Sequence, residues 1–356
     1  MHLADRLVPA LLVAALYVGC GAPSSSSPGL EAEAPAPVAV YGCEGDPLPS
    51  WAEGETKSAI LAFLGAAVDP HAAGFIPPEE RLATFDMDGT LLVEKPEYRL
   101  VEFMTARAVA AAREDAALRD NPVIAALLAG DEEAVRAFPP AEATQALESV
   151  NLGLTPAEYV AAARADAMER PHPRYEVAVP GLVYQPMKEL IALLSHHGFR
   201  VYLSTASEQD FARSFSAEAF GIPNERVIGS VVTHRVETRE GRLVVLRDGA
   251  IAEPFNVHEG KPIHIQRRLG RAPAVAVGNS DGDLEMLRYA RSRSGPSLAM
   301  LVHHDDETRE YAYDRGAEES LAAADELGIV VANMADDFAA MFPPDASACA
   351  RALTSP

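Results

Sequence analysis

The sequence predicts an α/β protein in which a doubly wound parallel sheet is interrupted by an all-helical insertion. Strand-like apolar runs alternate with amphipathic helical segments between residues 182 and 302, which is the pattern of a parallel sheet. Residues 95–177 contain several helical patterns and almost no strand pattern. We therefore expect a core formed by residues 46–94 and 178–345, a helical domain in 95–177, and a short tail in 346–356.

The composition is that of an ordinary globular protein with a strong acidic bias. Of the 356 residues, 48% are hydrophobic and 6% aromatic, and 52 acidic residues against 30 basic ones give a formal net charge of −22. The length suits one large α/β domain with a smaller insertion. Because nucleic-acid binding depends on neutralising phosphates with positive charge, we expect no nucleic-acid partner. Any phosphate group that the protein binds needs a local positive group.

The first residues predict export rather than a folded element. Arg6 precedes an apolar run in residues 7–18, which is too short to span a bilayer and suits the apolar region of a secretory signal peptide. A small residue and Cys20 then precede a Ser- and Pro-rich stretch, which resembles a bacterial lipoprotein signal with Cys20 as the acylated residue. Tyr17, where leucine is usual, and Asp5 depart from that pattern.

These features divide the ends of the chain. Residues 1–19 are expected to be a signal peptide and 20–45 a flexible tether, so that only a lipid anchors the exported protein to the membrane, facing the periplasm or cell exterior. A plainly secreted protein and an uncleaved cytosolic chain are the alternatives. Cys43 and Cys349 flank the globular part and could form a disulfide in an oxidising compartment. Two unrelated thiols fit the sequence equally well, because sequence does not determine connectivity.

Local patterns predict the elements of the first half. Residues 51–68 have apolar side chains at helical spacing and lead into a strand that ends at Phe85. The last helix of the insertion begins with T-P-A-E, in which Thr155 and Glu158 fit a capping box. The helices expected in the insertion span residues 98–118, 122–128, 131–137, 141–150 and 155–168.

The second half alternates between helices and strands. A helix that ends at Gly198 is followed by a strand in 199–204 and a helix in 208–220. β-Branched residues alternate around Glu240 and Gly241, which predicts a hairpin. The remaining segments are helices in 261–269 and 283–290 and strands in 274–277 and 297–302.

Two aspartates follow the first strand where it ends. The stretch R-L-A-T-F-D-M-D-G-T-L-L puts Asp86 and Asp88 at the carboxyl edge of the predicted sheet, where open α/β sheets bind their ligands. Carboxylates this close repel each other, so the site should hold a cation or share a proton. An Asx-rich loop without a chemical role is the alternative.

Later segments add polar groups to the same edge. Thr205, Ala206 and Ser207 follow a strand in S-T-A-S, where a hydroxyl and backbone N–H groups suit a phosphate oxygen, although Ser207 also fits a helix N-cap. Lys261 begins a helix in H-E-G-K-P, and it either balances the acids or is an ordinary surface charge.

An acid-rich loop and a histidine pair follow the last two predicted strands. In G-N-S-D-G-D, the side chains of Asn279, Asp281 and Asp283 offer hard oxygen ligands that suit Mg²⁺, and a surface turn rich in acids is the alternative. His303 and His304 either contact a substrate or a second metal, or are ordinary histidines at a strand end.

Four of these stretches, in this order, resemble the motif set of the haloacid dehalogenase-like (HAD) phosphohydrolase superfamily. The resemblance covers roughly residues 50–343 and implies a Rossmann-like core. The insertion in 95–177 is similar to the helical C1 cap of the phosphoserine phosphatase-like branch. Stretches such as F-G-I-P-N-E-R-V-I-G-S and V-H-H-D-D-E-T-R-E-Y-A-Y-D resemble a group of bacterial exported members, which implies no single substrate.

The resemblance implies a role for each motif residue. Asp86 would attack phosphorus to form an aspartyl-phosphate, and Asp88 would protonate the leaving alcohol and then activate water. Thr205, Ala206 and Lys261 would bind the phosphoryl oxygens. The implied Mg²⁺ ligands are the Asp86 carboxylate, the main-chain carbonyl of Asp88, Asn279 and Asp283.

Asn279 departs from the family pattern, because many relatives have aspartate there as a direct metal ligand. Asp283 or Asp281 would supply the missing charge, and we favour Asp283 because it aligns with the second acidic position of the family. The second aspartate of D-x-D argues against a true dehalogenase, whose reaction needs neither a leaving-group acid nor a metal. The expected function is Mg²⁺-dependent hydrolysis of a small phosphorylated metabolite. A phosphotransferase of the same type and a catalytically silent ligand-binding lipoprotein are the alternatives.

Overall fold

The structure, a computed structural model, describes residues 45–343, all of which lie within one compact unit, Val38–Pro356. The predicted signal peptide, the tether up to residue 44 and the tail in 346–356 lie outside the described residues. So do the three cysteines of the chain, Cys20, Cys43 and Cys349. Their lipidation and pairing therefore stay predictions. Within residues 45–343, no helix has the length and apolar character needed to cross a membrane.

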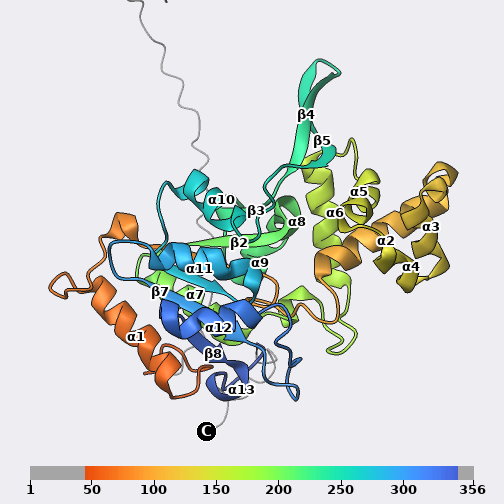
Figure 1. The fold of residues 1–356 in the computed structure, drawn as a ribbon. Coiled ribbons are helices and arrows are strands. Elements are labelled where there is room, and N and C mark those ends of the chain that lie inside the picture. Colours follow the sequence, from red (N-terminus) through yellow and green to blue (C-terminus); the bar gives the residue numbers. More distant parts are fainter. Residues whose placement is uncertain (1–44, 344–356) are drawn as a thin grey trace, which may run out of the picture. The chain divides into compact units, whose positions relative to one another are not determined.

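A six-stranded parallel sheet forms the centre of the core, in the order β3-β2-β1-β6-β7-β8 (Figure 1). β1 pairs with β2 on one side and with β6 on the other, so the chain winds outward from β1 in both directions. The doubly wound α/β core predicted from the sequence is confirmed. The strands are β1 (Leu82–Phe85), β2 (Arg200–Glu208), β3 (Val227–Ser230), β6 (Val275–Gly278), β7 (Leu298–His303) and β8 (Val330–Asn333).

Side chains that alternate along the strands fill two apolar layers. In β6, Val275 and Val277 join the cluster that contains the buried faces of α1 and α7, whereas Ala276 joins the cluster shared with α10, α11 and α12. Because both of its faces are covered, β6 is apolar throughout rather than alternating with polar residues. The covering helices are α1 (Glu55–Val68), α7 (Gln185–His196), α10 (Gly260–Leu269), α11 (Leu284–Arg291) and α12 (Glu318–Leu327).

The segment between β1 and α7 forms helices, as expected for the insertion. The first of them ends earlier than predicted, because Asp115 accepts a hydrogen bond from the Ala117 N–H and begins a 3₁₀ turn, Ala116–Asp120. Thr155 and Glu158 form the predicted capping box. The helices of the insertion are α2 (Arg99–Glu114), α3 (Pro122–Ala129), α4 (Glu132–Ala137), α5 (Pro140–Ser149) and α6 (Pro156–Glu169).

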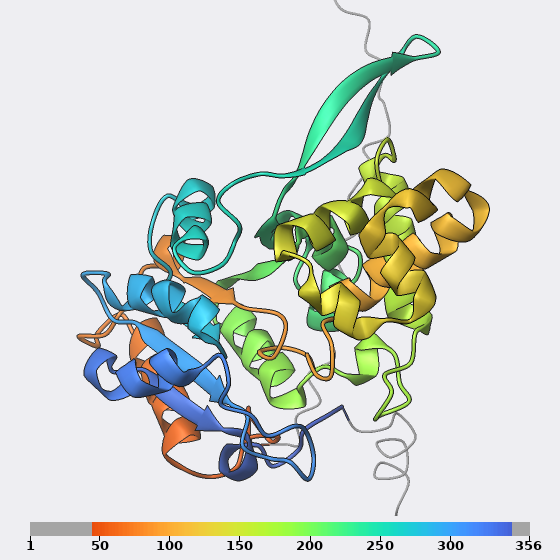
Figure 2. The same ribbon diagram turned by 45° about the vertical axis from the view of Figure 1, so that its right-hand side comes forward.

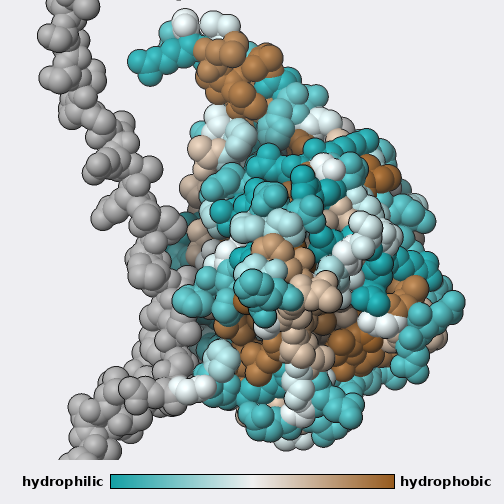
Figure 3. Space-filling model, turned by 90° about the vertical axis from the view of Figure 1, so that its left-hand side faces the viewer, coloured by the Kyte–Doolittle hydropathy of each residue, from teal (hydrophilic) through white to brown (hydrophobic). Residues whose placement is uncertain are grey.

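A separate antiparallel hairpin, β4 (Val232–Arg239) and β5 (Arg242–Ile251), follows β3 and extends away from the main sheet (Figure 2). Glu240 and Gly241 form its tight turn with φ of 50° and 75°, the left-handed pair that fits the twist of a two-residue hairpin turn. The predicted hairpin is therefore confirmed. Its outer part exposes apolar side chains, seen as the brown area at the upper edge of Figure 3: Val236, Leu243 and Val245.

The prediction of one helix in residues 208–220 is wrong in two respects. β2 continues to Glu208, and the chain then forms two short helices, α8 (Gln209–Arg213) and α9 (Ser216–Phe220). The Glu208 carboxylate caps α8 by accepting hydrogen bonds from the N–H groups of Asp210 and Phe211, which explains the late start of the helix. The sequence analysis also missed β8, α12 and the short α13 (Met334–Asp337).

Glu208 should make stability depend on pH. Burial raises the pKa of Glu208 from its ordinary value of 4.5 to about 7, although Arg247 acts to lower it. Between these values the folded protein keeps a proton that the unfolded chain releases, so this group lowers the free energy of unfolding as pH rises, and the loss levels off above about 7. The advantage of Glu208→Gln over the native protein should therefore grow from pH 5 to pH 8 in urea unfolding. Glu225→Gln, on an exposed turn, is the matched control and should give a constant difference. A constant or shrinking difference for Glu208→Gln would contradict this account.

Candidate active site

The turn after β1 places two aspartates at the carboxyl edge of the sheet. The Asp86 N–H donates to Val277 O at 2.9 Å, which continues the pairing with β6 by one residue. Gly89 then reverses the chain with φ of +74°, and a Cβ atom there would lie 2.1 Å from Asn279 Nδ2. Glycine is therefore required for the first aspartate turn and the acid-rich loop to approach each other.

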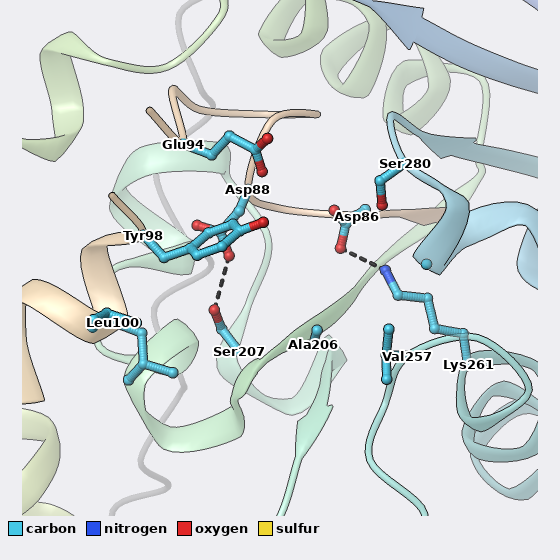
Figure 4. Close-up of a pocket in the computed structure, with 12 residues that line it drawn as sticks. Asp86, Asp88, Glu94, Tyr98, Leu100, Ala206, Ser207, Val257, Lys261 and Ser280 are labelled. Carbon is cyan, nitrogen blue, oxygen red and sulfur yellow. Dashed lines mark hydrogen bonds and ion pairs between the residues drawn. The ribbon is translucent and has the colours of Figure 1, made fainter. Parts of the chain in front are cut away.

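A buried ion triad joins three segments of the chain at this edge. Lys261 Nζ donates to Asp86 Oδ1 at 2.6 Å, the contact drawn in Figure 4, and to Asp283 Oδ1 at 2.5 Å. It also donates to Ser204 O, at the end region of β2, at 2.8 Å. The lysine and Asp283 are almost fully buried, and the lysine lies in the first turn of α10. The turn after β1, the strand β2 and the loop after β6 are thus bonded to one ammonium group.

Burial and mutual attraction act against each other in this triad. Burial raises the pKa of Asp86 well above its ordinary value, and the neighbouring Asp283 carboxylate raises it further, while Lys261 lowers it. For Lys261, burial acts to lower the pKa, but the attraction of Asp283 and Asp86 is stronger and raises it overall. Two carboxylates around one ammonium leave an excess of negative charge, which a cation would balance.

Asp88 lies next to the triad in a different environment. Ser207 Oγ donates to Asp88 Oδ2 at 2.8 Å, whereas Oδ1 of Asp88 is buried without a hydrogen-bond partner among the described residues. Burial raises the pKa of Asp88 to about 7; Ser207 lowers it and the Glu94 carboxylate raises it. A carboxyl group with this pKa can both hold and release a proton near neutral pH.

The S-T-A-S turn presents different atoms from those expected. Thr205 is fully buried, and its Oγ1 accepts a hydrogen bond from the Ser207 N–H at 3.0 Å, so this hydroxyl braces the turn and does not line the pocket. Ala206 and Ser207 do line it. Asn256, which the sequence analysis missed, donates from Nδ2 to Thr205 O at 2.9 Å and to Ile228 O at 3.1 Å. Only its position in P-F-N, shortly before H-E-G-K, could have drawn attention to it.

The acid-rich loop after β6 separates its three candidate residues. Asp283 belongs to the triad, and its Oδ2 accepts from the Asn279 N–H at 3.0 Å, while Asn279 Oδ1 accepts from Thr90 Oγ1 at 2.9 Å; these two residues lie behind the pocket lining. Asp281 instead accepts from the Ser320 N–H at 2.8 Å, in the first turn of α12. The structure therefore does not bring Asp281 to the other acids.

The two histidines at the end of β7 also lie outside the pocket lining. His303 contacts Asn333 Oδ1 and Asp314 Oδ1, each at 2.8 Å. His304 is buried, with Nε2 2.8 Å from Gly89 O and Nδ1 3.0 Å from Glu310 Oε2. His304 thus supports the aspartate turn from behind, and neither ring is placed to touch a ligand in the pocket.

A pocket of about 270 Å³ opens over the triad and Asp88. One wall comes from the segment that enters the insertion and includes Glu94 and Tyr98, which lie beside Asp88 in Figure 4. No motif marks these residues in the sequence, since their position depends on how the insertion folds back. The lining residues are Asp86, Asp88, Glu94, Tyr98, Leu100, Val101, Ala206, Ser207, Val257, Lys261, Ser280 and Gly282.

The donor set fits a hard divalent cation. Within residues 45–343, no three His, Cys, Asp or Glu side chains are grouped as a metal site. Asp86 and Asp283 would supply two carboxylates, Asn279 a neutral amide oxygen, and Asp88 its main-chain carbonyl. Carboxylate, amide and carbonyl oxygens are the ligands that Mg²⁺ prefers, and Mg²⁺ commonly keeps several waters.

The fold and site define a Rossmann-like α/β protein with a cluster of acids and one lysine at the carboxyl edge of its parallel sheet, and the comparisons identify its family. Residues 83–288 match the family model described as haloacid dehalogenase-like hydrolase, and the chain belongs to this family. No curated protein matches the chain.

Several solved structures are similar to the chain at low identity. A conserved protein of unknown function from Anaerococcus prevotii DSM 20548 is 14% identical, with a TM-score of 0.48 over 77% of this chain and 90% of that one. A protein of unknown function from Bordetella pertussis Tohama I is 18% identical, with a TM-score of 0.43 over 71% and 97%. A phosphoserine phosphohydrolase-like protein from Francisella tularensis is 13% identical, with a TM-score of 0.33 over 77% and 100%.

The two acids of the loop should differ in their effects when replaced. Asp283→Ala removes a partner of Lys261 and should abolish Mg²⁺-dependent hydrolysis of p-nitrophenyl phosphate. Asp281→Ala removes only the bond to the Ser320 N–H, so it should keep the activity and lower the free energy of unfolding by about 1 kcal/mol, as loss of a helix cap does. Steady-state rates and urea unfolding of both variants test this. Inactive Asp281→Ala beside active Asp283→Ala would reverse the assignment.

Proposed function

We propose that the protein is a Mg²⁺-dependent phosphomonoester hydrolase that acts on a small phosphorylated metabolite through an aspartyl-phosphate on Asp86. The observation that carries this proposal is the pair Asp86 and Asp88 on one turn, with Lys261 held between Asp86 and Asp283. A structural ion pair would need only one carboxylate, whereas phosphoryl transfer needs a nucleophile, an acid and a positive group around one point. Membership of the haloacid dehalogenase-like hydrolase family supports the same reaction class.

The first step is the attack of Asp86 on phosphorus. Lys261 holds Oδ1 of Asp86, and no hydrogen bond to Oδ2 is present among residues 45–343, so Oδ2 is the attacking oxygen. The new Oδ2–P bond forms as the P–O bond to the leaving alcohol breaks. Lys261 and the main-chain N–H of Ala206 would bind the phosphoryl oxygens, and Lys261 would exchange one of its three present acceptors for the phosphate. The chemistry that Mg²⁺ supplies when bound is charge neutralisation, which lets a phosphate dianion approach a carboxylate.

Asp88 handles the protons of both steps. Its Oδ2 accepts from Ser207, so the proton of the neutral acid lies on the unpartnered Oδ1. That proton passes to the leaving alcohol in the first step. In the second step Asp88 takes a proton from water, whose oxygen attacks phosphorus and releases phosphate and the Asp86 carboxylate. Ser207 orients the acid, which gives the S-T-A-S turn a role that does not require the Thr205 hydroxyl in the pocket.

The insertion in residues 95–177 would act as a C1-type cap of the phosphoserine phosphatase-like branch. Tyr98, Leu100 and Val101 line the pocket and belong to this segment, so they would contact the leaving group. A pocket of about 270 Å³ favours a small substrate. The Glu94 carboxylate on the same wall repels an acidic leaving group.

Two variants test the covalent mechanism. Asp86→Asn should lose all turnover of p-nitrophenyl phosphate, because the nucleophile is gone while Asp283 still pairs with Lys261. Asp88→Asn should release about one equivalent of p-nitrophenol and then stop, because this leaving group needs no acid but the attacking water needs a base. Mass spectrometry should find one phosphoryl group on Asp86 of that variant. Native-like turnover of Asp86→Asn, or no ester hydrolysed by the native protein across a broad panel, would refute the proposal.

We also propose, from the sequence of the first twenty residues, that the protein is exported and anchored by a lipid on Cys20. Cys20→Ser should move the protein from the membrane fraction to the soluble fraction of its host, and the mature N-terminus of the native protein should be an acylated Cys20. Cell fractionation and N-terminal mass spectrometry measure both. A mature protein that begins at another residue would contradict this proposal.

A further inference from the structure

The base of the β4–β5 hairpin is bonded to the helical insertion. The Arg247 N–H donates to Leu154 O at 2.8 Å, and the Gly153 N–H donates to Arg247 O at 3.0 Å. Gly153 and Leu154 lie in the turn between α5 and α6. The hairpin leaves the main sheet directly after β3, so its base connects the core to the insertion through backbone hydrogen bonds.

The Arg247 side chain extends this connection to four more segments. Its Nη2 lies 3.0 Å from Glu148 Oε2 in α5, and its Nη1 lies 3.3 Å from Glu208 Oε1 at the end of β2. The guanidinium carbon lies 3.6 Å from the centroid of the Tyr159 ring in α6. Nη1 is also 3.6 Å from Asp210 Oδ2 in α8. One planar cation therefore contacts two helices of the insertion and the end of a core strand.

This contact is not explained by stability alone. The side chain of Arg247 is 0% exposed, and those of Glu148 and Glu208 are 2% and 4% exposed. Removing such groups from water costs several kcal/mol per ion, and apolar residues of the same volume often stabilise a fold as well or better. A planar guanidinium differs from apolar packing because it imposes fixed directions on the groups that it binds. We therefore infer that Arg247, Glu148 and Glu208 fix the relative position of the segments to which they belong.

The core segment that Arg247 contacts lies next to the proposed catalytic acid. Glu208 follows Ser207, and Ser207 donates to the acid Asp88. Glu208 is held rigidly, because its two carboxylate oxygens also cap α8. Glu148, on the other side of Arg247, belongs to the insertion, whose first helix lines the pocket. A shift of the insertion would therefore displace the Ser207 turn, which orients Asp88.

We propose that Arg247 is a positioning residue that holds the helical insertion in register with the Ser207 turn, so that the pocket wall and the acid Asp88 keep a fixed spacing. This rests on the proposed phosphatase function. The proposal assigns a role to a residue that lies outside the family motifs, in strand β5 of the hairpin. Arg247 would act through its contacts with Glu148 and Glu208. Arg247 itself touches neither Asp86 nor Asp88 among the contacts of the structure.

Variants on both sides of the contact test the proposal. Arg247→Met removes the charge and keeps the length, Arg247→Lys keeps the charge without the planar fork, and Glu148→Gln weakens the insertion side. Arg242→Met, on the exposed part of the same strand, is the matched control. Rates with p-nitrophenyl phosphate and Mg²⁺ are normalised to folded protein. If Arg247→Met does not fold, Arg247→Lys and Glu148→Gln carry the test.

We expect kcat/KM to fall at least tenfold in Arg247→Met and severalfold in Arg247→Lys and Glu148→Gln. The Arg247→Met and Glu148→Gln changes should not add in the double variant, because they break one contact. Native kcat/KM in folded Arg247→Met, or additive effects in the double variant, would overturn the proposal. So would an equal loss in Arg242→Met.

Hydrogen exchange gives a readout that does not depend on turnover. Arg247→Met should speed exchange in both α6 and α8 while leaving α11 unchanged, because the contact joins the insertion to the end of β2. Faster exchange in only one of α6 and α8, or in neither, would overturn the positioning role. If the native protein hydrolyses no phosphate ester, the proposed function fails, and exchange alone still decides whether Arg247 couples the insertion to the core.

Discussion

The buried contact of Lys261 with Asp86 and Asp283 is the constraint on which the site depends. It requires β1 and β6 to be neighbours, because Asp86 directly follows β1 and Asp283 lies on the 3₁₀ turn that follows β6, and it requires α10 to begin beside them. A buried ammonium without partners would be far too costly to keep, so any displacement of one of the three segments is strongly opposed. Two carboxylates face one ammonium, so the site has an excess of negative charge that favours the binding of a cation.

The topology made this group of residues predictable. In a doubly wound sheet the carboxyl ends of all strands lie at one edge, and the largest gap between adjacent crossovers lies where the winding reverses. Asp86 follows the central strand β1, and Asn279 and Asp283 follow its neighbour β6. Asp86 and Asp88 could be placed at this edge because they follow an apolar run, whereas Lys261 begins a helix and was predicted there only because the acids need a positive group.

The orientation of individual side chains was not predictable in the same way. Thr205 and Ser207 both carry hydroxyl groups, and which of them faces the pocket depends on β2 continuing to Glu208, where pairing with β3 resumes. Asp281 and Asp283 are two residues apart on a 3₁₀ turn, so they point in different directions, one to α12 and one to Lys261. Tertiary contacts determine these orientations, and the local pattern of apolar and polar residues carries no information about such contacts. The same reason hid Glu94, Asn256 and Arg247, each of which acts on a segment distant in sequence.

The pair formed by His304 and Glu310 has a consequence for the field inside the protein. Nε2 of His304 faces the Gly89 carbonyl, which can only accept, so this nitrogen bears a hydrogen. Nδ1 faces a carboxylate oxygen, and a second proton must lie between these two atoms, on one or the other. Either placement leaves the pair neutral as a whole. The aspartate turn is therefore braced from behind by a strongly bonded unit that adds no net charge to its surroundings, and the ionic balance in front of the turn is left to the ligands that enter there.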